Sequence, residues 1–211
     1  IFDNLFAEEE KRQATETTSA EIERYRLGEK DFTPDLLKSI PFADSGRAFQ
    51  FLKVLRDGPE FYHPTEKSIR DFYSLLPKIL DLCVRVPMPN LAVENLVKFI
   101  ESSRARETFL DLFLDNEKFL ELLLILFGSS DLLSQILITS PDLMDVLLAV
   151  ESIYRFKTPE KTAAELKENL NARSDIDAKK TFLRQFKNAE ELRIGIRYLI
   201  KETDLPGTLG D

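Results

Sequence analysis

Several residue types are scarce in this 211-residue chain, and each scarcity narrows the possible functions. The single cysteine, Cys83, excludes an internal disulfide framework and suits a reducing compartment, so we expect a cytoplasmic protein. The single histidine, His63, cannot form a zinc site, and no adjacent serine or cysteine completes a nucleophile pair with it. We therefore interpret Cys83 as a core residue and His63 as a turn residue before a helix.

Long apolar runs and nucleotide-binding loops are also missing. No apolar run reaches the roughly 18 residues that a membrane span requires, and the longest, residues 122–127, has the length of a segment within a buried helix. We find no hairpin turn signal, no strand-like alternation and no fixed-length repeat. Glycine-rich phosphate loops and the common metal and hydrolase motifs are absent as well.

Basic residues are outnumbered by acidic ones, 29 to 37, which gives a formal net charge of -8 at pH 7. Binding to nucleic acid or to an anionic membrane depends on clustered Lys and Arg, so we expect neither as a partner. The chain has no tryptophan but 16 phenylalanines, and 43% of its residues are hydrophobic. This composition is sufficient for a sizeable apolar core.

From residue 33 onwards, apolar residues recur at helical spacing with short breaks. The pattern predicts an all-α fold, a multi-helix antiparallel bundle with a long C-terminal helix over about residues 174–201. We expect a polar N-terminal helix or arm over residues 1–39 and a helical bundle core over residues 40–157. Residues 158–211 are predicted to form C-terminal helices that lead towards a further domain.

Helix starts are predicted where a hydroxyl residue precedes a proline. Thr33, Ser140 and Thr158 each do so, and each is expected to cap the helix that follows. Pro77 lies within a helical pattern and is expected to kink that helix.

The main candidate for a metal site is an Asp-x-Asp pair, Asp175 and Asp177. Such a pair holds magnesium in nucleotidyltransferases when it lies on a β-strand, where alternate residues point the same way. Here the following residues have helical spacing, and residues two apart on a helix point about 200° apart. We therefore predict no metal site, and interpret Ser174 as the cap of the last helix.

Three arginines, Arg184, Arg193 and Arg197, lie along the predicted last helix. Arg193 and Arg197 are four residues apart and share one face, so we take the three as candidates for an interface with a domain or partner. The alternative is a solvated helix face on which the arginines pair with Glu190 and Glu191. We predict no catalytic and no cofactor-binding residue in this chain.

Five segments, in this order, resemble the helical region of glutamine synthetase adenylyltransferases: residues 48–58 (AFQFLKVLRDG), 75–80, 87–100 (PMPNLAVENLVKFI), 113–148 and 182–205. The last segment resembles the helix that leads into a nucleotidyltransferase domain in that family. The order of the segments favours the position before the C-terminal, AMP-adding domain.

The resemblance implies a function. Proteins of this family carry two nucleotidyltransferase domains, one that transfers AMP from ATP to a tyrosine of glutamine synthetase and one that removes it by phosphorolysis. A PII signal protein and glutamine adjust the balance between them. The chain, which starts at Ile1, would be an internal, non-catalytic linker or regulatory fragment, with the catalytic signature after Asp211. ATP and Mg²⁺ would then bind only to the full-length parent, and the partners would be the adjacent nucleotidyltransferase domain, glutamine synthetase and the PII protein.

Two other functions remain open at this point. The first is a stand-alone helical protein-interaction module without enzymatic activity. The second is a helical domain that binds a small molecule, which would need a buried polar group in the Phe/Leu-rich core, and the sequence singles out none.

Overall fold

The computed structural model describes residues 32–38, 40–148 and 158–202. Within these ranges the regular elements are helices and none is a strand, which confirms the all-α class. The chain divides into two compact units, Ile1–Asp131 (unit 1) and Leu132–Asp211 (unit 2), which we describe separately. The predicted domain limits at residues 39 and 157, and most of the predicted N-terminal arm, lie outside the described residues.

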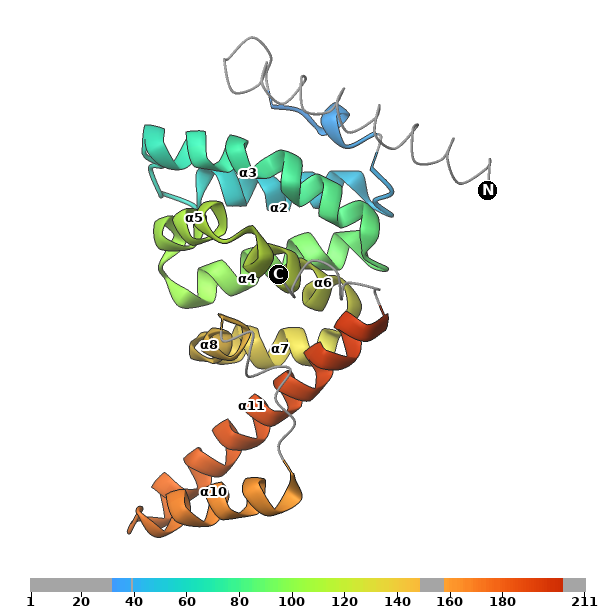
Figure 1. Ribbon diagram of the computed structural model, residues 1–211. Helices are drawn as coiled ribbons and strands as arrows, with labels where there is room; N and C mark the ends of the chain where they lie inside the picture. The colour runs from blue at the N-terminus through green and yellow to red at the C-terminus, as the bar shows by residue number, and fades with distance from the viewer. Residues whose placement is uncertain (1–31, 39, 149–157, 203–211) are drawn as a thin grey trace, which may run out of the picture. The chain divides into compact units, whose positions relative to one another are not determined.

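Unit 1 is a bundle of helices that pack on one another in pairs. Its elements are the 3-10 helix η1 (Pro34–Leu37), α2 (Ser45–Asp57), α3 (Glu66–Arg85), α4 (Pro89–Ser103), α5 (Arg106–Asp115) and α6 (Glu117–Ser129). Helix α2 contacts α3 and α4, α3 contacts α5 and α6, and α4 contacts α6 (Figure 1). The predicted helical bundle is therefore confirmed in this unit.

Phenylalanines form the centre of unit 1, as the composition predicted. Phe99 packs edge-on against Phe109 with ring centroids 4.9 Å apart, and it also lies 5.8 Å from Phe127. Phe113 continues this chain of rings towards Phe119 at 5.9 Å. Because aromatic rings bury large areas and prefer tilted or edge-on contacts, this chain of rings joins α4, α5 and α6 into one core.

The buried run 122–127 and the single cysteine take the positions that the sequence predicted. Residues 122–127 are all buried within α6. Cys83 on α3 has no exposed surface, and burial raises the pKa of its thiol from 9.0 to about 12. A thiol that stays protonated is a poor nucleophile, so Cys83 is a core residue. His63 is exposed in the irregular segment before α3, also as predicted.

Helix caps follow the predictions in part. Thr158 caps α10 (Pro159–Asn171), since its hydroxyl accepts a hydrogen bond from the Lys161 amide at 3.4 Å. Thr33 and Ser140 hold N-cap positions, but their hydroxyls make no capping bond, which corrects the prediction for both. They precede 3-10 helices, in which an amide three residues on bonds the cap carbonyl instead, as the Leu143 amide does to Ser140 at 3.0 Å. Helix α3 is continuous through Pro77.

The core contains a buried polar side chain, Asn95, which the sequence did not single out. Asn95 on α4 is fully buried, and its Nδ2 donates to the carbonyl oxygen of Phe127 at 3.2 Å. Near the C-terminal end of α6, carbonyl groups lack partners within the helix. Asn95 therefore satisfies one of these carbonyls and joins α4 to α6.

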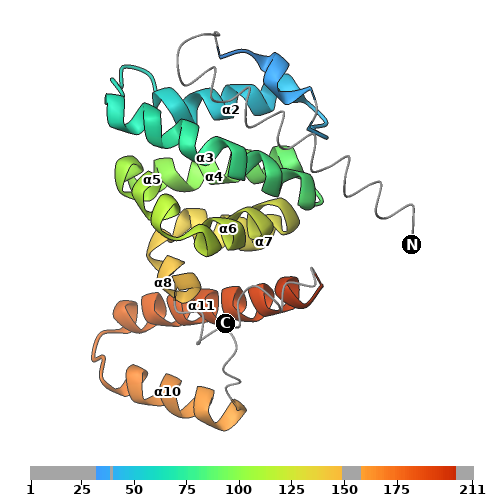
Figure 2. The ribbon, with the colours of Figure 1, turned by 45° about the horizontal axis from the view of Figure 1, so that its top comes forward.

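Unit 2 contains α7 (Asp131–Thr139), the 3-10 helix η2 (Pro141–Leu143), α8 (Met144–Leu148), α10 and α11 (Ile176–Glu202). Helix α11 is the long C-terminal helix that the sequence predicted. It contacts α8 and α10, and Figure 2 shows α11 folding back alongside α10. Across the described part of both units, no helix has the length and apolar character that crossing a bilayer requires.

Candidate interface on the last helix

The N-cap of helix α11 lies one residue later than predicted, and the helix itself begins at Ile176. Its cap is Asp175, whose Oδ2 accepts a hydrogen bond from the Ala178 amide at 2.8 Å, so the assignment of Ser174 as the cap was wrong. A carboxylate accepts a stronger hydrogen bond from a backbone amide than a hydroxyl does. It also interacts favourably with the positive end of the helix dipole. Asp177 forms an exposed ion pair with Lys180 at 3.2 Å. The two aspartates thus have separate structural partners.

An arginine just after α10 joins the end of that helix to the start of α11. The Arg173 guanidinium lies 4.1 Å from the centroid of the Phe182 ring, and its Nη1 donates to the carbonyl of Asn169 at 2.6 Å. The Phe182 and Phe186 rings lie 5.7 Å apart along α11. The Arg173 contacts with Asn169 and Phe182 therefore connect α10 to α11.

One face of α11 is buried within unit 2. Leu192, Ile196 and Ile200 are each at most 2% exposed. Next to them Gly195 lies so close to α7 that a Cβ atom there would stand 2.5 Å from a methyl group of Leu133. The absence of a side chain at Gly195 therefore allows α7 and α11 to approach closely.

The opposite face of α11 carries large apolar side chains that are exposed. They are Ile176, Leu183, Ile194 and Tyr198, between 41% and 61% exposed, and we call them the α11 stripe. At about 100° per residue, all four point within about 60° of one another, whereas Leu192 and Ile196 point away from them. Leu183 and Tyr198 are about 22 Å apart along the axis. The helix is therefore apolar on two opposite sides, of which unit 2 covers one.

The sequence contains a signal for this stripe. Apolar residues stand at every second position from 192 to 200, an alternation that contradicts the stated absence of strand-like patterning. On a helix, residues two apart point to nearly opposite sides. Within a helix, such alternation therefore indicates two apolar faces.

The three predicted arginines flank the α11 stripe but differ in accessibility. Arg184 is exposed on one side of it, while Arg193 and Arg197 lie on the other. Arg193 is only 6% exposed, and its Nε donates to Glu190 Oε2 at 3.1 Å. The predicted pairing of Arg193 with Glu190 is confirmed, whereas Glu191 pairs with Lys187 at 2.9 Å. The interface role of the arginines stays a prediction.

No cluster of three or more His, Cys, Asp or Glu side chains suited to a metal ion occurs among the described residues. The arrangement on α11 offers instead an elongated apolar strip with charged side chains along its edges. Protein interfaces commonly combine an apolar centre with a polar rim. We therefore treat the α11 stripe as the candidate functional site.

Comparison with known proteins gives one consistent family. Residues 120–209 match the family model described as glutamate-ammonia ligase adenylyltransferase. The bifunctional glutamine synthetase adenylyltransferase/adenylyl-removing enzyme of Pseudomonas aeruginosa is 29% identical over 175 residues, which cover 82% of this chain and 17% of the relative. The enzyme of the same name from Pseudomonas syringae pv. tomato is 28% identical over 155 residues, which cover 72% and 16% of the two chains. These matches confirm the resemblance inferred from the sequence.

A third relative with that name, from Thioalkalivibrio sulfidiphilus, is 27% identical, with coverage of 80% of this chain and 18% of the relative. The chain thus spans less than a fifth of the length of these relatives. No solved structure matches it significantly.

Proposed function

We propose that this chain is a non-catalytic helical segment of an adenylyltransferase that acts on glutamine synthetase. Its role is to hold an adjoining nucleotidyltransferase domain against α11 and to transmit effector state to that domain through helix packing. ATP and Mg²⁺ would bind to the nucleotidyltransferase domain of the complete parent. Glutamine synthetase and a PII signal protein would be its protein partners, in the cytoplasm.

The α11 stripe is the observation that carries this proposal. Leu183 and Ile194 are 41% and 51% exposed on the face opposite the buried Leu192. Covering each of them contributes on the order of 1 kcal/mol at about 25 cal/mol per Å² of apolar area. Interfaces between domains of one chain are of moderate size and partly polar, which suits a short apolar strip with charged edges. The similarity to adenylyltransferases supports a nucleotidyltransferase domain as the occupant.

The two-faced helix also supports the regulatory part of the proposal. In this proposal α11 packs inside unit 2 on one side and against a catalytic domain on the other. A shift of this helix would therefore change its contacts with unit 2 and with the catalytic domain together. An effector that binds one position of α11 more tightly than another would favour that position, and it would thereby change the position of the catalytic domain.

The first test is an assay of this chain with ATP, Mg²⁺ and glutamine synthetase. The chain alone is expected to incorporate no AMP above background, and the complete parent protein is expected to transfer it. Robust incorporation by the chain alone would contradict the non-catalytic role.

The second test concerns the α11 stripe. Leu183→Glu combined with Ile194→Glu is expected to weaken binding to the separately produced nucleotidyltransferase domain by at least about tenfold, because both side chains lose their apolar contacts. Titration calorimetry measures the affinity. The matched control is Leu132→Glu, which changes a 65% exposed leucine on α7 and should leave binding unchanged.

Two results would count against this assignment. Equal binding by the double variant and the unmodified chain would show that the α11 stripe is not the docking surface. No binding by the unmodified chain would favour the stand-alone interaction module. Arg193→Glu is unsuitable as a probe, because it would place a buried carboxylate beside Glu190 and destabilise unit 2.

A further inference from the structure

The loop that joins α2 to α3, residues 58–65, displays an aromatic side chain in an unusual way. Phe61 has φ +68°, in the left-handed region that bulky residues rarely adopt. Its side chain is 89% exposed, the largest value among the exposed large hydrophobic residues of the described chain. Arg104, the other described non-glycine residue with positive φ, occupies the C-cap of α4, where this conformation is common. Phe61 is the third residue of a β-turn in which the Tyr62 amide donates to the Pro59 carbonyl at 3.0 Å, and positive φ at that position normally selects Gly or Asn. A phenylalanine there is unusual, and strained residues of this kind concentrate at functional sites.

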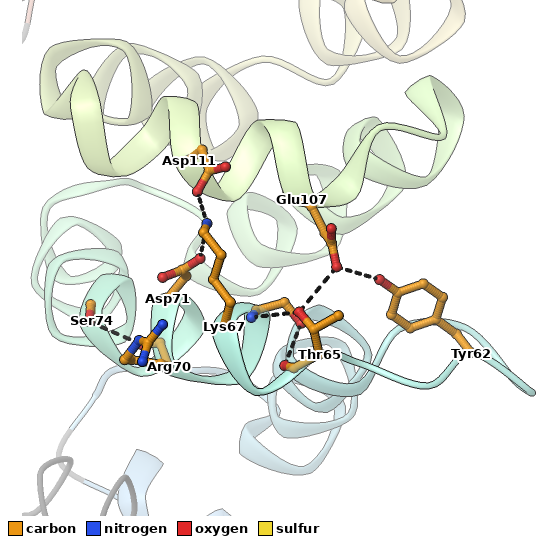
Figure 3. Close-up of polar contacts among 9 residues, drawn as sticks. Tyr62, Thr65, Lys67, Arg70, Asp71, Ser74, Glu107 and Asp111 are labelled. Atoms are coloured by element: carbon orange, nitrogen blue, oxygen red, sulfur yellow. Dashed lines mark hydrogen bonds and ion pairs between the residues drawn. The ribbon is translucent and has the colours of Figure 1, made fainter.

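The neighbouring residue, Tyr62, fixes the loop against the rest of unit 1. Its ring covers Gly58, where a Cβ atom would stand only 2.2 Å from the ring. Its hydroxyl donates to Glu107 Oε1 at 3.3 Å, as Figure 3 shows. The Arg106 guanidinium lies 5.5 Å from the ring centroid on the α5 side. These three contacts hold the Tyr62 side chain against unit 1. The side chain of the neighbouring Phe61 points into solvent.

The second end of the loop is fixed in the same way. The Thr65 hydroxyl donates to the same Glu107 oxygen at 3.2 Å and accepts a hydrogen bond from the Ser68 amide at 3.1 Å. Two residues further on, in the first turn of α3, Lys67 bridges Asp71 and Asp111 (Figure 3). Because Tyr62 and Thr65 are both tied to Glu107 of α5, little conformational entropy remains to be lost when a partner covers Phe61.

Acidic residues flank Phe61 in the sequence, with Glu60 directly before it and Glu66 five residues after it. Glu60 and Glu66 are exposed, and neither forms an ion pair within the described residues. Glu107 is also exposed, and it accepts only neutral hydroxyl donors in this part of the chain. A partner surface that receives Phe61 must therefore place basic groups around an apolar pocket. A second copy of the chain, which has a net charge of -8, is disfavoured by the same argument.

We infer that this loop docks the protein substrate of the parent enzyme, with Phe61 inserted into an apolar pocket rimmed by Lys and Arg on glutamine synthetase. This inference rests on the proposed function. A permanent domain contact needs an extended apolar surface, which the α11 stripe provides. A single preorganised aromatic within a charged ring suits a contact that forms quickly and dissociates after each turnover.

The test is a kinetic comparison of the complete parent enzyme with its Phe61→Asn variant. Asparagine tolerates positive φ, so the fold should keep its thermal stability or gain some. The KM for glutamine synthetase is expected to rise at least about tenfold, with kcat and the KM for ATP unchanged. Phe61→Tyr, which keeps the ring, should restore a KM near that of the unmodified enzyme. Leu132→Asn, the same kind of change at an exposed site on α7, should have no effect.

An unchanged KM for glutamine synthetase in Phe61→Asn would overturn the inference. So would a Phe61-dependent dimer of the chain in sedimentation velocity with an unchanged KM, because the occupant would then be a second copy. Should the unmodified parent transfer no AMP, the proposed function fails separately. Surface plasmon resonance of this 211-residue chain on immobilised glutamine synthetase then decides, since Phe61-dependent binding supports the docking role and its absence refutes it.

Discussion

Leu126→Ala is expected to lower the free energy of unfolding by about 2–5 kcal/mol. Leu126 is 1% exposed near the C-terminal end of α6, between Ile125 and Phe127, which are buried as well. Truncation removes apolar contacts, and the packed helices around α6 can close the resulting cavity only in part. Urea denaturation followed by far-UV circular dichroism measures the change.

Leu132→Ala is the matched control for this prediction. Leu132 is 65% exposed, so the same truncation there should change stability by no more than about 0.5 kcal/mol. A loss below about 1 kcal/mol for Leu126→Ala would mean that α6 is not the centre of the unit 1 core.

Gly128→Ala is expected to lower the free energy of unfolding by about 1–3 kcal/mol, although alanine is the better helix former by up to about 1 kcal/mol. A Cβ atom at Gly128 would stand 2.7 Å from Cβ of Val86 and 3.2 Å from Cβ of Ala92. Neither Cβ can move without its backbone. Helix α6 cannot retreat easily either, because the Met88 amide donates to the Gly128 carbonyl at 3.0 Å. Thermal denaturation by calorimetry would measure the loss.

Gly46→Ala is the same chemical change, but it is expected to raise the free energy of unfolding instead of lowering it. The nearest atom to a Cβ atom at Gly46 is Oδ1 of Asp44 at 3.4 Å, an ordinary contact, within the first turn of α2. Alanine there should raise stability by about 0.5–1 kcal/mol, since it restricts the unfolded chain. If both substitutions shift stability in the same direction, the close approach of α6 to Val86 is not the dominant effect.

Local sequence patterns predicted the helices well because each helix is specified by neighbours within a few residues. The spacing of apolar residues around Cys83 and along residues 122–127 indicated their burial, and the structure confirms it. Caps were less certain, since several polar residues near a helix start compete for the same amide. Thr158 was assigned correctly, whereas Asp175 rather than Ser174 accepts the amide of α11.

The candidate sites were predicted less completely. The arginines of α11 were singled out from charge and spacing, but the sequence could not distinguish the buried Arg193 from the exposed Arg184. The α11 stripe was missed because apolar alternation was considered only as a strand signal. Asn95 was missed because a single polar residue within an apolar helix gives no local indication of its partner.

The sequence by itself determined the all-α class, the long last helix, the apolar composition of the core and the resemblance to glutamine synthetase adenylyltransferases. These depend on periodicity, composition and the order of segments, which can be read along the chain. Only the tertiary structure decided that Asn95 bonds the end of α6, that unit 2 covers one apolar face of α11, and that Tyr62 turns inward while Phe61 points to solvent. Each of these depends on residues that are distant in sequence, and their contacts exist only once the helices have packed.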